Sequence, residues 1–246
     1  MTDTRSRVTA HGCAIAIATI GVLAVVMPSR AGAASTQRIT LRTDDGVVLA
    51  ATWYEPSTRP APAVILVHML QRSRRDFDAL GSRLSAEGIG ALAIDLRGHG
   101  ESQHQGDIQD YTNLVLDVKA ARRFLTTRND VQQARVGILG ASLGANLAIL
   151  QAGGDGSIAS VVLLSPSLDY RGLRIEPSLR KYGARPALLV AAADDPYAAR
   201  SARELRKVGD GRRELVILSH AGHGTQMLGR DPDLVRTVTD WFKRTL

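Results

Sequence analysis

The sequence predicts an α/β domain with a mostly parallel, twisted sheet of about eight strands, helices on both faces and an N-terminal antiparallel hairpin. Three observations predict this class. Short, continuous apolar runs recur along the chain, as in strands that are buried on both faces of a sheet. Stretches of helical period separate these runs, so that strand and helix alternate. The first two strand-like segments are instead joined by a tight turn, which indicates a hairpin.

The individual elements follow from local patterns along the chain. Residues 38–42 alternate in polarity, Asp44-Asp45-Gly46 is a turn signal, and residues 47–54 form the second arm of the hairpin. Further strands are expected over residues 63–67, 91–94, 136–139, 160–164, 187–190 and 215–218. Helices are expected over residues 76–87, 110–125, 143–151, 198–208 and 233–242.

The first 33 residues have the three parts of a secretory signal. Arg5 and Arg7 precede an apolar run over residues 13–27, and Ala31-Gly32-Ala33 provides small residues for a cut after Ala33. We therefore expect an exported protein, periplasmic or secreted, with one domain over residues 34–246 and no stable membrane insertion of that mature domain. The alternative is an uncleaved membrane anchor, although the run is shorter than the roughly 20 residues that a span needs.

Composition excludes some partners. The chain has 31 Lys and Arg against 24 Asp and Glu, giving a net charge of +7. The positive residues are scattered and are not interleaved with aromatic residues, so we expect no nucleic-acid partner. The one cysteine, Cys13, lies in the predicted signal and says nothing about the redox compartment. No feature of the sequence indicates an oligomeric state.

Polar residues stand directly after the predicted strands, where ligands bind in open parallel sheets. Residues 140–144 read Gly-Ala-Ser-Leu-Gly and join a strand to a helix, which exposes Ser142 on a tight turn between two glycines. A serine hydroxyl needs a base, which histidine can supply, and a carboxylate to stabilise the imidazolium. Asp194 and Asp195 follow a later strand, and His223 follows the last one.

Three motifs make residues 38–246 resemble an α/β-hydrolase without a large lid domain. They are Gly-Ala-Ser-Leu-Gly at 140–144, Asp-Leu-Arg-Gly-His-Gly-Glu-Ser at 95–102 and Gly-His-Gly at 222–224, with the order Ser, Asp, His along the chain. The resemblance implies that Ser142 is the nucleophile, His223 the base and an aspartate after residues 187–190 the acid. Asp195 is favoured because it precedes a proline, as the acid often does in the family, and Asp194 is the alternative. His220 is a rival base that lacks the flanking glycines.

The resemblance also implies an oxyanion hole. Its first donor is the N–H of Leu143, and the family's His-Gly-x stretch maps its second donor onto Leu70. Met69 stands where the family has glycine, and the N–H of Met69 is therefore the alternative. No metal and no organic cofactor are expected.

The expected function is a carboxylesterase-like serine hydrolase (EC 3.1.1) that cleaves esters of small or medium acyl groups through an acyl-enzyme. The expected partner is thus a small-molecule ester. Residues 166–186 are too few for a helical lid, which favours an open site. The same triad could act on thioester, lactone (dienelactone-type) or peptide bonds, and a non-catalytic binding protein of hydrolase fold is a further alternative.

Overall fold

A computed structural model describes residues 1–2, 35–103 and 111–246 of the chain. The predicted signal segment, apart from its first two residues, lies outside this part. Within the described residues, none of the helices combines the length and the apolar composition that a membrane span requires.

The main sheet has eight strands in the order β1-β2-β4-β3-β5-β6-β9-β10. The pairs β1–β2 and β2–β4 are antiparallel and the remaining neighbours are parallel, which confirms the predicted class of sheet. The bounds are β1 Thr36–Arg42, β2 Val48–Tyr54, β3 Ala61–Val67, β4 Gly90–Ile94, β5 Val131–Ala141, β6 Ile158–Leu164, β9 Ala187–Ala192 and β10 Arg213–Leu218.

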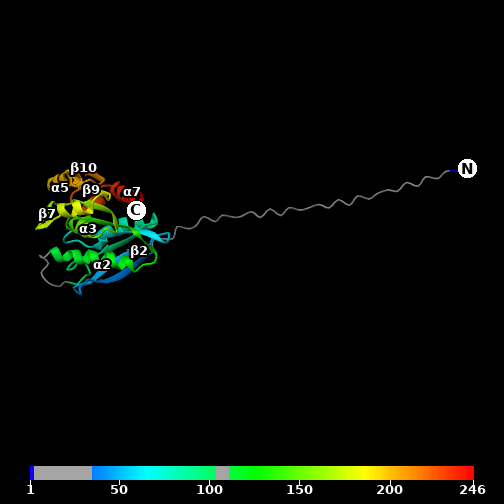
Figure 1. Ribbon diagram of the computed structural model, residues 1–246, viewed down its shortest axis with the longest axis horizontal. Coiled ribbons are helices and arrows are strands. Elements are labelled where there is room, and N and C mark those ends of the chain that lie inside the picture. The colour runs from blue at the N-terminus through cyan, green and yellow to red at the C-terminus, as the bar shows by residue number, and fades with distance from the viewer. Residues whose placement is uncertain (3–34, 104–110) are drawn as a thin grey trace. The chain divides into compact units, whose positions relative to one another are not determined.

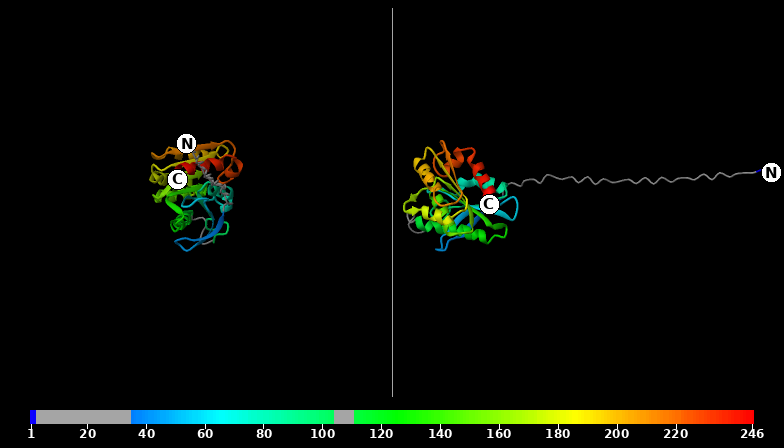
Figure 2. Two further views of the ribbon diagram at one scale, coloured as in Figure 1. Left: turned by 90° about the vertical axis from the view of Figure 1, so that its right-hand side faces the viewer. Right: turned by 45° about the horizontal axis from the view of Figure 1, so that its top comes forward.

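Helices cover both faces of this sheet because the buried strands send alternate side chains to opposite sides. In β3, Ile65 and Val67 belong to one apolar cluster, whereas Val64 and Leu66 belong to the other. The first face is covered by α2 (Val115–Thr126), α3 (Leu143–Gly154), α4 (Glu176–Tyr182) and α5 (Pro196–Arg206). The second face is covered by α1 (Asp78–Ala86), α6 (Gln226–Arg230) and α7 (Leu234–Thr245), the last of these red in Figure 2.

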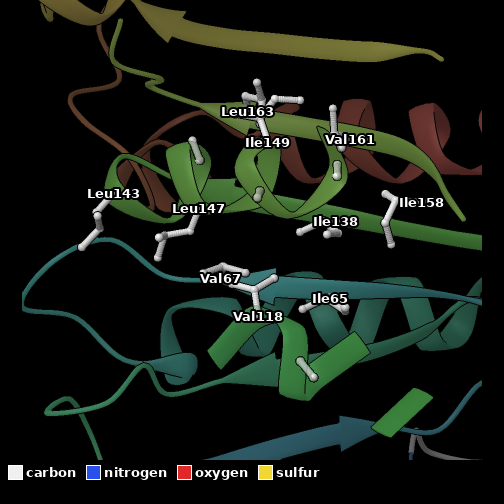
Figure 3. Packing of buried hydrophobic residues seen from close by; sticks show 14 of the residues in the cluster. Ile65, Val67, Val118, Ile138, Leu143, Leu147, Ile149, Ile158, Val161 and Leu163 are labelled. Carbon is white, nitrogen blue, oxygen red and sulfur yellow. The ribbon is translucent and has the colours of Figure 1, made fainter. Parts of the chain in front are cut away.

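The helix α3, which follows the serine turn, is packed into the centre of the first face. It lies beside α2 (Figure 1). Figure 3 shows Leu143 and Leu147 at its N-terminal end, close to Val67 of β3 and Val118 of α2. All four side chains are fully buried. The start of α3 is therefore held rigidly against the central strands, at the carboxyl ends where the candidate site residues were predicted.

Several short elements were not predicted. The strands β7 (Asp169–Tyr170) and β8 (Leu173–Arg174) form a small separate hairpin, and α6 has only five residues. Two 3-10 turns, η1 (Arg74–Phe77) and η2 (Tyr111–Leu114), lead into α1 and α2. The interval 166–186 holds the β7–β8 hairpin and α4 but no lid domain, as its length predicted.

Candidate active site

Ser142 occupies a strained turn between β5 and α3. Its backbone has φ 52° and ψ −115°, in the positive-φ region that side chains rarely adopt. The Ser142 N–H donates a hydrogen bond to the carbonyl of Leu164 in the neighbouring strand β6, with an N···O distance of 2.8 Å. This contact fixes the turn at the carboxyl ends of the strands and leaves the hydroxyl free to point away from the sheet.

The two flanking glycines allow the backbone to pass closely at this turn. A Cβ on Gly140 would collide with the carbonyl of Gly144, and a Cβ on Gly144 would collide with the carbonyls of Val67 and His68. A larger residue at Gly140 would push α3 away from β5, and a larger residue at Gly144 would push it away from the end of β3. The two glycines around Ser142 are therefore required by the close packing of α3 against the strands, whether or not the serine takes part in a reaction.

The imidazole of His223 lies between the serine and an aspartate. Its Nε2 is 2.7 Å from Ser142 Oγ, and its Nδ1 is 2.5 Å from Asp195 Oδ2. The side chain of His223 is 44% exposed, whereas that of Asp195 is 16% exposed, and Ser142 is buried apart from 8% of its surface. The structure thus brings the three predicted residues into one hydrogen-bonded chain that is open to solvent at the histidine.

Asp194, the alternative acid, faces the backbone before His223 and not its ring. Its carboxylate accepts hydrogen bonds from the N–H groups of Ala221 and Gly222, each over 3.2 Å. Desolvation acts to raise the pKa of Asp194, but these hydrogen bonds outweigh it, and its pKa lies below the ordinary value. His220, the rival base, is exposed and makes no hydrogen bond to Ser142.

Two further side chains hold the loop on the other side of His223. The Gly224 N–H donates to Ser165 Oγ over 2.9 Å, and the Thr225 hydroxyl donates to Asp76. The sequence analysis did not identify Ser165 or Asp76. Ser165 directly follows the predicted strand 160–164, a position that marked polar candidates elsewhere, whereas the Asp76–Thr225 contact spans 149 residues and has no sequence signal.

The segment after β3 lies against this loop and carries the predicted second oxyanion donor. The Met69 carbonyl accepts hydrogen bonds from His68 Nδ1, over 2.7 Å, and from the Arg72 N–H, over 3.3 Å. Within the described residues, the N–H groups of Leu70 and Leu143 have no hydrogen-bond partner. Both are therefore available as donors to a bound molecule.

His68 is a neutral support for this segment. Its ring is fully buried, and burial lowers its pKa to about 4. Its Nε2 accepts from the Leu96 N–H over 3.0 Å, so the proton sits on Nδ1 and is donated to Met69. His68 thus fixes the orientation of the peptide that joins Met69 to Leu70.

No metal-binding cluster accompanies these residues in the described part of the chain. There, no group of three or more His, Cys, Asp or Glu side chains is placed to hold an ion. A serine, an imidazole, a carboxylate and free N–H donors in this arrangement are the groups that acyl transfer requires.

The family model described as serine aminopeptidase, S33, matches residues 58–187, more than half of the chain. The chain belongs to this family of α/β hydrolases. This family membership confirms the resemblance that was inferred from the three motifs, and it identifies the protein as a hydrolase.

The chain is also similar to individual proteins of known sequence or structure. An uncharacterized protein of Mycobacterium tuberculosis, MT2364, is 28% identical over 230 residues, which cover 85% of this chain and 78% of the relative. Two solved structures share the fold. The Pyrococcus furiosus esterase Pf2001 has a TM-score of 0.72 at 18% identity, covering 91% of this chain and 97% of that one. A dienelactone hydrolase from Anabaena variabilis has a TM-score of 0.72 at 20% identity, covering 87% and 99%.

Proposed function

We propose that this S33 hydrolase cleaves carboxylic esters of small or medium acyl groups, with Ser142 as nucleophile, His223 as base and Asp195 as acid. The observation that carries the proposal is the hydrogen-bonded chain from Ser142 Oγ through the His223 ring to Asp195 Oδ2. The esterase and dienelactone hydrolase among its structural neighbours support esters and related bonds as the substrate class.

In the first half of the reaction, Ser142 Oγ attacks the acyl carbon while its proton passes to His223 Nε2. Asp195 accepts the Nδ1–H and stabilises the imidazolium that forms. The carbonyl oxygen becomes negative and accepts hydrogen bonds from the N–H groups of Leu143 and Leu70. Collapse of the intermediate breaks the bond to the alcohol, which leaves with the proton from His223.

The second half of the reaction repeats these steps with water. His223 takes a proton from a water molecule, which attacks the acyl carbon of the acyl-enzyme. The second tetrahedral intermediate uses the same N–H donors. Its collapse returns the proton to Ser142 Oγ and releases the carboxylic acid, so that no cofactor is consumed.

Leu70 is proposed in preference to Met69 as the second oxyanion donor. In a trans peptide the C=O and the following N–H point in opposite directions. The Met69 carbonyl is turned toward His68 Nδ1 and the Arg72 N–H, so the Leu70 N–H points away from both. Leu70 itself is only half-buried, which leaves its surroundings open to a substrate.

The direct test compares the wild-type protein with Ser142→Ala and with the control Ser157→Ala, which changes a serine near the far end of α3. We expect Ser142→Ala to lower kcat for p-nitrophenyl butyrate by about 10⁴-fold or more, and the control to retain activity. A fluorophosphonate should label the wild type and the control, because it requires an activated serine. Equal hydrolysis by Ser142→Ala and wild type would remove the proposal.

A substrate panel then decides which bond is cleaved. Matched butyryl oxygen esters, thioesters and lactones, together with aminoacyl p-nitroanilides, share the acyl-transfer step but differ in the leaving group. We expect the highest kcat/KM for the oxygen esters. A clear preference for the p-nitroanilides would instead assign peptidase activity to the same triad, and the absence of both labelling and turnover would point to a binding protein.

A further inference from the structure

Two successive residues at the end of β6 contact the segments that carry the nucleophile and the base. The carbonyl of Leu164 accepts the Ser142 N–H over 2.8 Å. The hydroxyl of the next residue, Ser165, accepts the Gly224 N–H over 2.9 Å, and Gly224 directly follows His223. This dipeptide therefore binds the backbone of both segments, although Ser165 takes no part in the reaction as described so far.

The hydroxyl of Ser165 is a rigid acceptor. The residue is buried, and its N–H donates to the carbonyl of Val190 in the neighbouring strand β9 over 2.7 Å. Its Oγ lies 3.9 Å from Met227 Sδ, to which the hydroxyl donates its own proton. The lone pairs of Oγ are thereby left for the N–H of Gly224.

The backbone of Ser165 is strained, which separates the role of the side chain from that of the turn. Its φ of 48° lies in the left-handed region, which glycine adopts more readily than any residue with a Cβ. A glycine would therefore fit this turn with less strain, but it would leave the buried N–H of Gly224 without an acceptor. What the serine adds at this position is the acceptor.

The ring of His223 depends on its backbone for its position, because 44% of its side chain is exposed and little packing surrounds it. Before the histidine, the carboxylate of Asp194 accepts hydrogen bonds from two backbone N–H groups. After it, Ser165 accepts the N–H of Gly224. The loop is thus fastened on both sides of the ring, with Nε2 held 2.7 Å from Ser142 Oγ.

Gly224 also contacts the segment that carries the proposed oxyanion donor Leu70. The Sδ atom of Met69 lies 2.5 Å from the point where a Cβ on Gly224 would stand. A movement of Gly224 would therefore disturb the packing of this segment as well as the backbone of the base.

We propose that Ser165 is a positioning residue for the reaction, and that its hydroxyl keeps the His223 imidazole aligned with the Ser142 hydroxyl by accepting the Gly224 N–H. Ser165 acts through the loop, and it neither contacts the substrate nor exchanges a proton with it. Because a displacement of about 1 Å in a reacting group can cost about a hundredfold in rate, one backbone hydrogen bond beside the base is sufficient to affect catalysis. This inference rests on the proposed esterase function and adds a residue to its machinery.

The test compares Ser165→Ala and Ser165→Gly with the control Ser160→Ala. Ser160 lies in the same strand and is fully buried, and its hydroxyl accepts the Trp241 Nε1–H over 2.9 Å, so the control also removes a buried hydrogen bond. For each folded variant, kcat and KM for p-nitrophenyl butyrate and the second-order rate of fluorophosphonate inactivation are measured. The midpoint of urea unfolding reports stability separately.

We expect both Ser165 variants to lower kcat and the inactivation rate by about ten- to hundredfold while KM changes by less than about threefold. Ser165→Gly should be the more stable of the two, because it relieves the strain, and yet equally slow. Ser160→Ala should lose stability and keep its kcat. Full activity in a folded Ser165 variant, or an equal loss of kcat in the control, would overturn the positioning role. A wild-type protein that is neither labelled nor active would instead refute the proposed function itself.

Discussion

Asp194 and Gly222 are joined across the site, because both carboxylate oxygens of Asp194 lie 3.2 Å from the Gly222 backbone nitrogen. The next residue, Asp195, reaches the ring of His223 instead. Two adjacent carboxylates thus act on one loop in different ways. Asp194 holds the backbone immediately before the histidine, and Asp195 orients the imidazole.

This division predicts unequal effects of the same substitution at the two positions. Asp195→Asn should lower kcat for p-nitrophenyl butyrate by about 10⁴-fold, because an amide favours the wrong imidazole tautomer and cannot stabilise the imidazolium. Asp194→Asn keeps an acceptor oxygen for the loop and should cost less than about tenfold. Initial-rate kinetics on the two purified variants measure both effects, and a larger loss at Asp194 would reverse the assignment.

The close approach of α3 to β3 predicts a stability effect at Gly144. Gly144→Ala places a methyl group against the Val67 and His68 carbonyls and should lower the free energy of unfolding by about 3 kcal/mol. Gly154→Ala, in the same helix, meets no atom within 4 Å and should change it by no more than about 1 kcal/mol. Urea unfolding monitored by circular dichroism compares the two. Similar values for both variants would contradict the packing account.

Much of the fold could be predicted because the central strands are long apolar runs. A strand that is buried on both faces, such as β3 or β6, is recognisable in the sequence as a continuous apolar run. β5 begins at Val131, five residues before the predicted strand, because its first residues include exposed polar side chains that show no pattern. The β7–β8 hairpin and α6 were missed since elements of two to five residues are too short to show a period.

The candidate site was predictable in outline because parallel topology gathers the ends of distant strands. Ser142 and His223 follow different strands and meet for that reason. The proline after Asp195 favoured this residue over Asp194 in the sequence, but which of the two carboxylates reaches the ring depends on the backbone angles of a turn after β9. The contact of Asp76 with Thr225 had no sequence signal, because it depends on side-chain geometry between remote segments. Ser165, in contrast, directly follows a predicted strand, and its position could have singled it out.

The N-terminal sequence predicts processing, and we propose that the protein is exported and cut after Ala33. The exported form should then begin at Ala34 and lack the only cysteine. Expression of the full chain in a bacterium, followed by fractionation and intact-mass measurement, tests this. Ala33→Leu should block the cut and retain the longer form. A wild-type protein of full length in the membrane fraction would favour an uncleaved anchor instead.

Burial of His68 predicts a pH-dependent loss of stability. The pKa of this ring falls from 6.5 to about 4 on folding because burial penalises the charged form. In the unfolded chain, His68 therefore binds a proton below pH 6.5, whereas in the folded chain it binds one only below about pH 4. The contribution of neutral His68 to stability is thus complete above pH 6.5, and it is lost as the pH falls through this window. The difference of 2.5 pH units corresponds to about 3 kcal/mol at pH 4. Urea unfolding at pH 7 and pH 4 should show a loss that is larger by this amount in the wild type than in His68→Asn, which cannot titrate. His220→Asn, at an exposed histidine, should behave like the wild type, and an equal pH dependence in all three proteins would show that His68 is not buried in its neutral form.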